Sequence, residues 1–125
     1  MQLLLDTHAL IWWLSKDSTL SLAAKGAISN PDNIVFVSAA SAWEIAIKKS
    51  LGKLQAPDDL SLQVEKNRFI PLAIRIEYAL NVDKLPLHHQ DRFHCILIVQ
   101  AMNDKLIIMT RDRKFEAYEV KTIQS

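Results

Sequence analysis

Two aspartates each follow a short apolar run that has the character of a buried strand. Asp6 comes directly after residues 2–5, and Asp112 closes the polar triplet after residues 106–109. Ligands of open parallel sheets bind beyond the carboxyl ends of the strands, so both carboxylates are expected at that edge. Either aspartate alone is equally well explained as a polar strand end or a helix N-cap. Together they indicate an acidic site.

Glu44 is the third candidate acid. It lies within residues 39–47, where every other residue except Ser41 is Ala, Trp or Ile. A charge with apolar neighbours on all sides of a helix is costly to bury unless a cation or a metal ion neutralises it. The alternative is that Glu44 faces solvent along a narrow stripe, with Lys48 one turn later as its ion-pair partner.

Carboxylates that converge from distant parts of a chain repel one another, and such a cluster persists mainly with a divalent cation. We therefore expect Mg²⁺ or Mn²⁺ as cofactor. Such an ion activates water for attack on a phosphodiester and stabilises the leaving oxygen. The basic residues near these acids are candidates for binding substrate phosphate, although each alone is also explained as a solvated charge: Lys48, Arg111 and Arg113.

The elements that must position these residues can be predicted from apolar runs and helix signals. Buried strands are expected at residues 2–5, 34–37 and 106–109, with a further strand-like segment at 69–72. Helices are expected at residues 39–51, 57–68, 74–85 and 91–103. This alternation favours an α/β fold, a three-layer domain whose mainly parallel central sheet is flanked by helices.

Composition narrows the class of protein. The 125 residues suit one domain over 1–125, and the formal net charge of +1 gives no overall argument for a nucleic-acid partner. The single Cys95 excludes an internal disulfide and fits a reducing cytoplasm. Asp6 and His8 interrupt the apolar N-terminal stretch, so neither a signal peptide nor a membrane span is predicted. We expect a soluble, cytoplasmic protein without a membrane partner.

Three segments, spread over nearly the whole chain, resemble the PIN-domain ribonucleases of the VapC toxin type. LLLDTHALIWWL, residues 3–14, resembles the family's opening strand with its first catalytic Asp, and SAWEIAIKKSLGKL, residues 41–54, resembles the segment with its Glu. TRDRKFEAY, residues 110–118, resembles the closing motif. The resemblance implies a parallel sheet between helices, metal-dependent cleavage of structured RNA, a homodimer and a cognate antitoxin partner. It assigns metal binding and catalysis to Asp6, Glu44 and Asp112.

The fourth acid of that family pattern is replaced here. The family typically reads LP-x-x-H-x-DPFDR-x-LIAQA, whereas residues 85–101 read LPLHHQDRFHCILIVQA. His89, Asp91 and Phe93 match the pattern, but His94 stands where the catalytic Asp is expected and Cys95 where Arg is usual. Like Asp6 and Asp112, Asp91 could be a helix N-cap, and its family position favours that role over metal binding.

Three interpretations of His94 remain open. His94 binds the metal through neutral imidazole and moves the preference towards Mn²⁺ or Zn²⁺, Asp91 takes the place of the missing acid, or the site is impaired. The last interpretation gives the alternative function, a catalytically impaired PIN-fold protein that binds RNA or the antitoxin. A phosphotransfer domain of the haloacid-dehalogenase type is disfavoured, because it usually needs a second acid where this chain has His8.

Aromatic residues leave the oligomeric state open at the sequence level. Trp12, Trp13 and Trp43 could anchor an interface, where aromatic side chains are enriched, or could belong to the core. His8 and His88 are assigned to polar surface or local capping.

Overall fold

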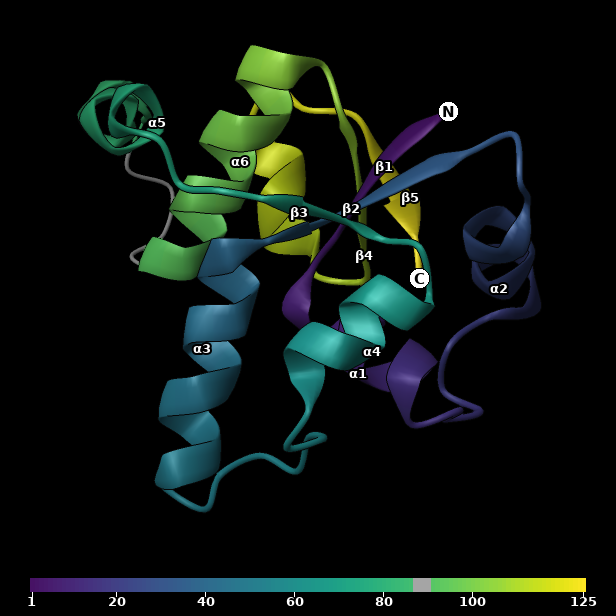
Figure 1. Cartoon of the computed structure of the whole chain (residues 1–125). Coiled ribbons are helices and arrows are strands. Elements are labelled where there is room, and N and C mark those ends of the chain that lie inside the picture. Colours follow the sequence, from purple (N-terminus) through teal and green to yellow (C-terminus); the bar gives the residue numbers. More distant parts are fainter. Residues whose placement is uncertain (87–90) are drawn as a thin grey trace.

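The fold is built on a parallel sheet with β1 in its middle. The computed structural model describes residues 1–86 and 91–125, and within them the strand order is β3-β2-β1-β4-β5, with every neighbouring pair parallel (Figure 1). The strands are β1 Gln2–Leu5, β2 Ile34–Ser38, β3 Ile70–Leu72, β4 Ile107–Thr110 and β5 Thr122–Gln124. The expected α/β fold with a parallel central sheet is confirmed.

Helices cover both faces of this sheet (Figure 1). They are α1 Thr7–Leu14, α2 Leu22–Ser29, α3 Ala39–Ser50, α4 Leu60–Lys66, α5 Ile76–Asn81 and α6 Arg92–Asp104, with 3₁₀ turns η1 Val82–Lys84 and η2 Arg113–Ala117. Helices α1, α2 and α4 contribute to one apolar cluster, and α6 and η2 contribute to the other. The sheet is thus the middle of three layers.

The alternation of side chains along β1 explains why three consecutive residues of this strand, Leu3, Leu4 and Leu5, are apolar. Leu3 and Leu5 belong to the cluster on the α1 side, whereas Leu4 belongs to the cluster on the α6 side. All three are 0% exposed. Successive strand residues point to opposite faces, so a strand covered on both faces must be apolar at every position. Asp6, the first polar residue after these three leucines, therefore marks the end of the apolar part of the strand.

Some element boundaries differ from the expectation. The helix expected at residues 57–68 begins only at Leu60, and the one expected at residues 74–85 is the short α5 followed by η1. Helices α1 and α2, the 3₁₀ turn η2 and strand β5 had no counterpart in the expectation. The positions of His88 and His89 lie outside the described residues. In the described part of the chain, no helix has the length and apolarity to cross a membrane.

A polar contact ties α5 to α6, the helix that carries His94. The Tyr78 hydroxyl donates to Asp104 Oδ2 at 2.5 Å and accepts from Arg75 Nη2 at 2.7 Å. The Arg75 guanidinium also lies over the Tyr78 ring, 4.6 Å from its centroid. Tyr78 is buried, so its hydroxyl needs these partners to offset the loss of water.

Tyr78→Phe is expected to lower the free energy of unfolding by about 1–2 kcal/mol, because Asp104 and Arg75 each lose a buried hydrogen-bond partner. Urea denaturation followed by circular dichroism measures this difference. Leu80→Ala on the same helix, where the side chain is 68% exposed, is the control and should change the value by less than about 0.5 kcal/mol. A Tyr78→Phe variant as stable as the wild type would contradict this role.

Candidate functional site

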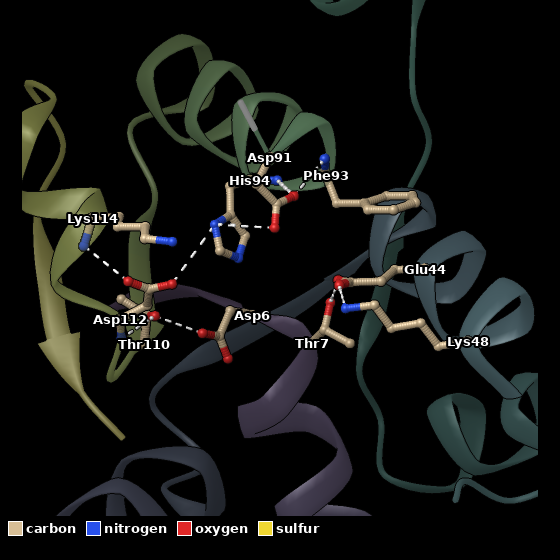
Figure 2. Close-up of polar contacts among 10 residues, drawn as sticks. All are labelled: Asp6, Thr7, Glu44, Lys48, Asp91, Phe93, His94, Thr110, Asp112 and Lys114. Atoms are coloured by element: carbon tan, nitrogen blue, oxygen red, sulfur yellow. Dashed lines mark hydrogen bonds and ion pairs between the residues drawn. The ribbon is translucent and has the colours of Figure 1, made fainter. Parts of the chain in front are cut away.

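Asp6 occupies the junction between β1 and α1 and is held there from two sides. Its Oδ1 accepts from the backbone N–H of Ala9 at 2.8 Å, which makes Asp6 the N-cap of α1. Its Oδ2 accepts from the Thr110 hydroxyl at 2.5 Å, across the sheet from the end of β4 (Figure 2). The residue is only 4% exposed. Asp6 is therefore both a cap and a buried acid.

Burial has a clear electrostatic effect on Asp6. Loss of water raises the pKa of its carboxyl above the ordinary value, and the hydrogen bonds from Thr110 and Ala9 offset part of this rise. The ionised form is the one that burial disfavours. A cation close to Asp6 would therefore stabilise the carboxylate.

Thr110 links Asp6 to the second predicted acid. While its hydroxyl donates to Asp6, its Oγ1 accepts from the backbone N–H of Asp112 at 3.1 Å. Asp112 in turn caps η2, with its Oδ1 accepting from the N–H of Lys114 at 2.9 Å. The predicted convergence of Asp6 and Asp112 thus runs through one shared hydroxyl. Thr110 was not predicted as a site residue.

His94 lies between two carboxylates (Figure 2). Its Nδ1 is 3.6 Å from Asp91 Oδ2 and 3.9 Å from Asp112 Oδ2, and its side chain is only 14% exposed. The imidazole packs against the Phe115 ring with 4.6 Å between the ring centroids. Asp91 caps α6 through its Oδ1, which accepts from the N–H groups of Phe93 and His94. Its expected capping role is thereby confirmed.

Glu44 belongs to a separate group of contacts. Its Oε1 accepts from the Thr7 hydroxyl and its Oε2 pairs with Lys48 Nζ, both at 2.5 Å. Glu44 is 3% exposed, so the alternative of a solvent-facing side chain does not hold. The proposed pairing with Lys48 one turn later is confirmed. Thr7, which holds Glu44 next to the end of β1, was not predicted as a site residue.

The three predicted acids thus lie at the carboxyl edge of the sheet in two groups. Asp6 and Asp112 share Thr110, and Asp112 has His94 beside it, whereas Glu44 is held by Thr7 and Lys48 (Figure 2). Over residues 1–86 and 91–125, no three His, Cys, Asp or Glu side chains are arranged to hold a metal ion. The donors themselves, carboxylate oxygens with one imidazole, are of the kind that Mg²⁺ and Mn²⁺ accept.

The predicted phosphate-binding residues differ in their surroundings. The Arg111 guanidinium donates to the backbone carbonyls of Thr19 and Ser125, both at 2.6 Å, and lies 4.8 Å from the centroid of the Trp12 ring. These contacts direct it towards the α1–α2 connection. Arg113 is exposed in η2. Lys48 pairs with Glu44, as described above.

An open hollow of about 1050 Å³ borders the Glu44 group between α3, η1 and α6. Lys48 and Asp91 contribute polar groups to its lining, and Trp43 and Phe93 contribute aromatic rings. These two rings meet edge to face, with 5.2 Å between their centroids.

Comparison with known proteins agrees with the observed fold. The PIN domain family model matches residues 3–121 of the chain, while no curated protein matches it. The fold is similar to that of VapBC2 from Rickettsia felis bound to a DNA fragment from the promoter, with a TM-score of 0.71 and 12% identity over 100% of this chain and 99% of that chain.

Two further solved structures are similar in fold. VapBC-1 from nontypeable Haemophilus influenzae matches with a TM-score of 0.70 and 16% identity, over 99% of this chain and 98% of that chain. A toxin-antitoxin complex from Klebsiella pneumoniae matches with a TM-score of 0.63 and 20% identity, over 96% of this chain and 94% of that chain. At such identities the likeness shows a common fold, whereas the family model spans nearly the whole chain. This chain belongs to the PIN domain family.

Proposed function

We propose that this chain is a single-domain, divalent-metal-dependent endoribonuclease and the toxin of a toxin–antitoxin pair. The observation that carries the proposal is the buried Asp6 carboxylate, joined through Thr110 to Asp112 at the carboxyl edge of the sheet. Membership of the PIN domain family supports nuclease chemistry at this edge. The RNA substrate rests on the resemblance to VapC-type motifs in residues 3–14, 41–54 and 110–118.

The cofactor we propose is Mg²⁺ or Mn²⁺, held by Asp6 and Asp112 with Glu44 as a third ligand and either His94 or Asp91 as a fourth. Burial raises the pKa of Asp6 in the metal-free protein, and this supports the fit, because a cation would offset the lost hydration of the carboxylate. When bound, the metal supplies a water of lowered pKa and positive charge for the leaving oxygen.

The chain's own residues position these groups. Asp6 cannot turn away from the sheet edge without losing its contacts to Ala9 and Thr110. Asp112 is fixed in the same way by capping η2. Lys48 and the exposed Arg113 are proposed to contact substrate phosphates, whereas Arg111 would have to leave its backbone acceptors to do so.

We also propose an antitoxin partner and a homodimer. Solved structures with a similar fold are VapBC and other toxin-antitoxin complexes, which supports the antitoxin. Large apolar side chains exposed on α3 and α5 support an interface between two copies, because such side chains gain stability when covered. They are Trp43, Ile47, Ile76 and Leu80, exposed to 56%, 38%, 76% and 68%.

The alternative function is a catalytically impaired protein of the same fold that binds RNA or the antitoxin. The position of His94 favours it, since an imidazole, which carries no negative charge, stands beside Asp112 where the resemblance expects a further carboxylate. Fewer negative charges hold a second divalent ion less well. The RNA cleavage rates of the wild type and of His94→Asp decide between these two functions.

Asp6→Asn is expected to weaken Mn²⁺ binding at least tenfold, a loss of about 1.4 kcal/mol, because the amide keeps the shape of the side chain but removes its charge. Calorimetric titration of the metal-free protein measures this change. Asp32→Asn, in the exposed turn before β2, is the control for a general loss of negative charge. Equal affinity in Asp6→Asn and the wild type would remove Asp6 from the metal site.

The wild type is expected to cleave structured RNA in Mg²⁺ or Mn²⁺, to lose this activity in EDTA and to act weakly on duplex DNA. Incubation with total RNA and with plasmid tests this. Asp6→Asn, purified in the same way, controls for contaminating ribonuclease. Cleavage that is unchanged in Asp6→Asn would point to contaminating ribonuclease, whereas EDTA-resistant cleavage that Asp6→Asn abolishes would argue against the metal-dependent mechanism.

His94→Asp is expected to raise the initial rate of Mg²⁺-dependent RNA cleavage at least tenfold, about 1.4 kcal/mol of barrier, because it restores a negative charge next to Asp112. If Asp91 already fills that role, His94→Asp should change little, and Asp91→Asn should abolish cleavage. Asparagine also caps helices well, so Asp91→Asn keeps the start of α6.

The three proteins are compared across a series of Mg²⁺ and Mn²⁺ concentrations, with folding checked by circular dichroism. A folded His94→Asp variant no faster than the wild type in Mg²⁺ would contradict the missing-charge explanation. Restoration of cleavage from an inactive wild type would support the impaired protein as the natural state.

A further inference from the structure

Both carboxylate oxygens of Glu44 have partners within this chain. Thr7 donates to Oε1 and Lys48 pairs with Oε2, each at 2.5 Å (Figure 2). The Glu44 side chain is 4% exposed, so solvent contributes little to its stabilisation. The ammonium group of Lys48 is therefore the counter-charge that lies against the buried Glu44 carboxylate.

The next residue of α3 shows that this arrangement is specific to Lys48. Lys49 pairs with Asp58, whose side chain is 97% exposed, so that pair is surrounded by water. Exposed ion pairs contribute little because water already stabilises both charges. Lys48 and Lys49 thus carry the same charge on the same helix turn, but only Lys48 neutralises a buried acid.

A divalent cation at Glu44 would have to compete with this ammonium. Lys48 and the metal ion are both attracted to the same carboxylate and repel each other. The Lys48 side chain is 41% exposed and lines the hollow between α3 and α6. Its ammonium can therefore leave Glu44 for open solvent without passing through the core.

We infer that Lys48 is an internal counter-cation that competes with the divalent metal for Glu44, so that Glu44 becomes a metal ligand only when Lys48 moves away. The inference rests on the proposed metal-dependent function. In the resting chain, Asp6 and Asp112 hold the metal, and Glu44 contributes little to its affinity. Lys48 is thus a positioning residue that sets how many carboxylates the metal can use.

The test is Mn²⁺ binding to the full metal-free chain, measured by calorimetry, with the bound ions counted by electron paramagnetic resonance. Lys48→Met is expected to bind Mn²⁺ about tenfold more tightly than the wild type, or to bind one more ion, because Glu44 is released. Lys49→Met is the matched control and should stay within about twofold of the wild type. Lys48→Arg keeps the charge and should resemble the wild type.

The double variant Glu44→Gln/Lys48→Met closes a mutant cycle, and its Mn²⁺ affinity should return to that of the wild type. Glu44→Gln alone should stay within about threefold of the wild type, since Glu44 is occupied in the resting chain. Glu44→Gln keeps the inference testable if Lys48→Met does not fold without metal. If Glu44→Gln lost as much Mn²⁺ affinity as Asp6→Asn, the inference would be overturned.

The outcomes also separate the inference from the function on which it rests. If the wild type binds Mn²⁺ and a folded Lys48→Met variant binds the same number of ions with the same affinity, the inference is overturned and the proposed function stands. If neither protein binds Mn²⁺, the proposed function falls as well. If the wild type binds none and Lys48→Met binds one ion, the inference is overturned in its statement that Asp6 and Asp112 hold the metal in the resting chain.

Discussion

The removal of the Asp6 carboxylate from water is the constraint on which the site depends. The residue directly follows the central strand, after three leucines that are buried between the two helical layers. Its negative charge must then be stabilised by hydrogen bonds from α1 and β4. The following residue, Thr7, makes the equivalent contact to α3. One dipeptide thereby joins the carboxyl edge of the sheet to both acidic groups.

The fold could be predicted where burial acts on consecutive residues. Strands β1, β2 and β4 are apolar runs because they are covered on both faces, and α3 and α6 carry enough apolar residues to be recognised. Strand β5 was missed because it has three residues at the sheet edge, of which only Ile123 packs on the core. Helix α2 was missed because it is short and contains Gly26, which weakens the helix signal.

The site could be predicted only in part, because sequence identifies acids better than it identifies their partners. The convergence of Asp6 and Asp112 followed from the strand ends, and the burial of Glu44 followed from its apolar neighbours. The role of Thr110 depends on the pairing of Leu5 with Met109, and that of Thr7 depends on the pairing of Leu5 with Val37, neither of which sequence gives. Arg111 was assigned to phosphate from proximity alone, whereas the fold directs it to backbone carbonyls.

The hydrogen bond between Thr110 and Asp6 joins residues 104 positions apart. Because β1 pairs with β2 on one side and β4 on the other, the strand made first is completed by one made near the end. A nascent chain still lacking β4 and η2 has neither the hydroxyl that orients Asp6 nor the carboxylate of Asp112. The acidic edge therefore cannot form until β4 and η2 have been synthesised, so a nascent chain that carries β1 and α3 alone has no completed site.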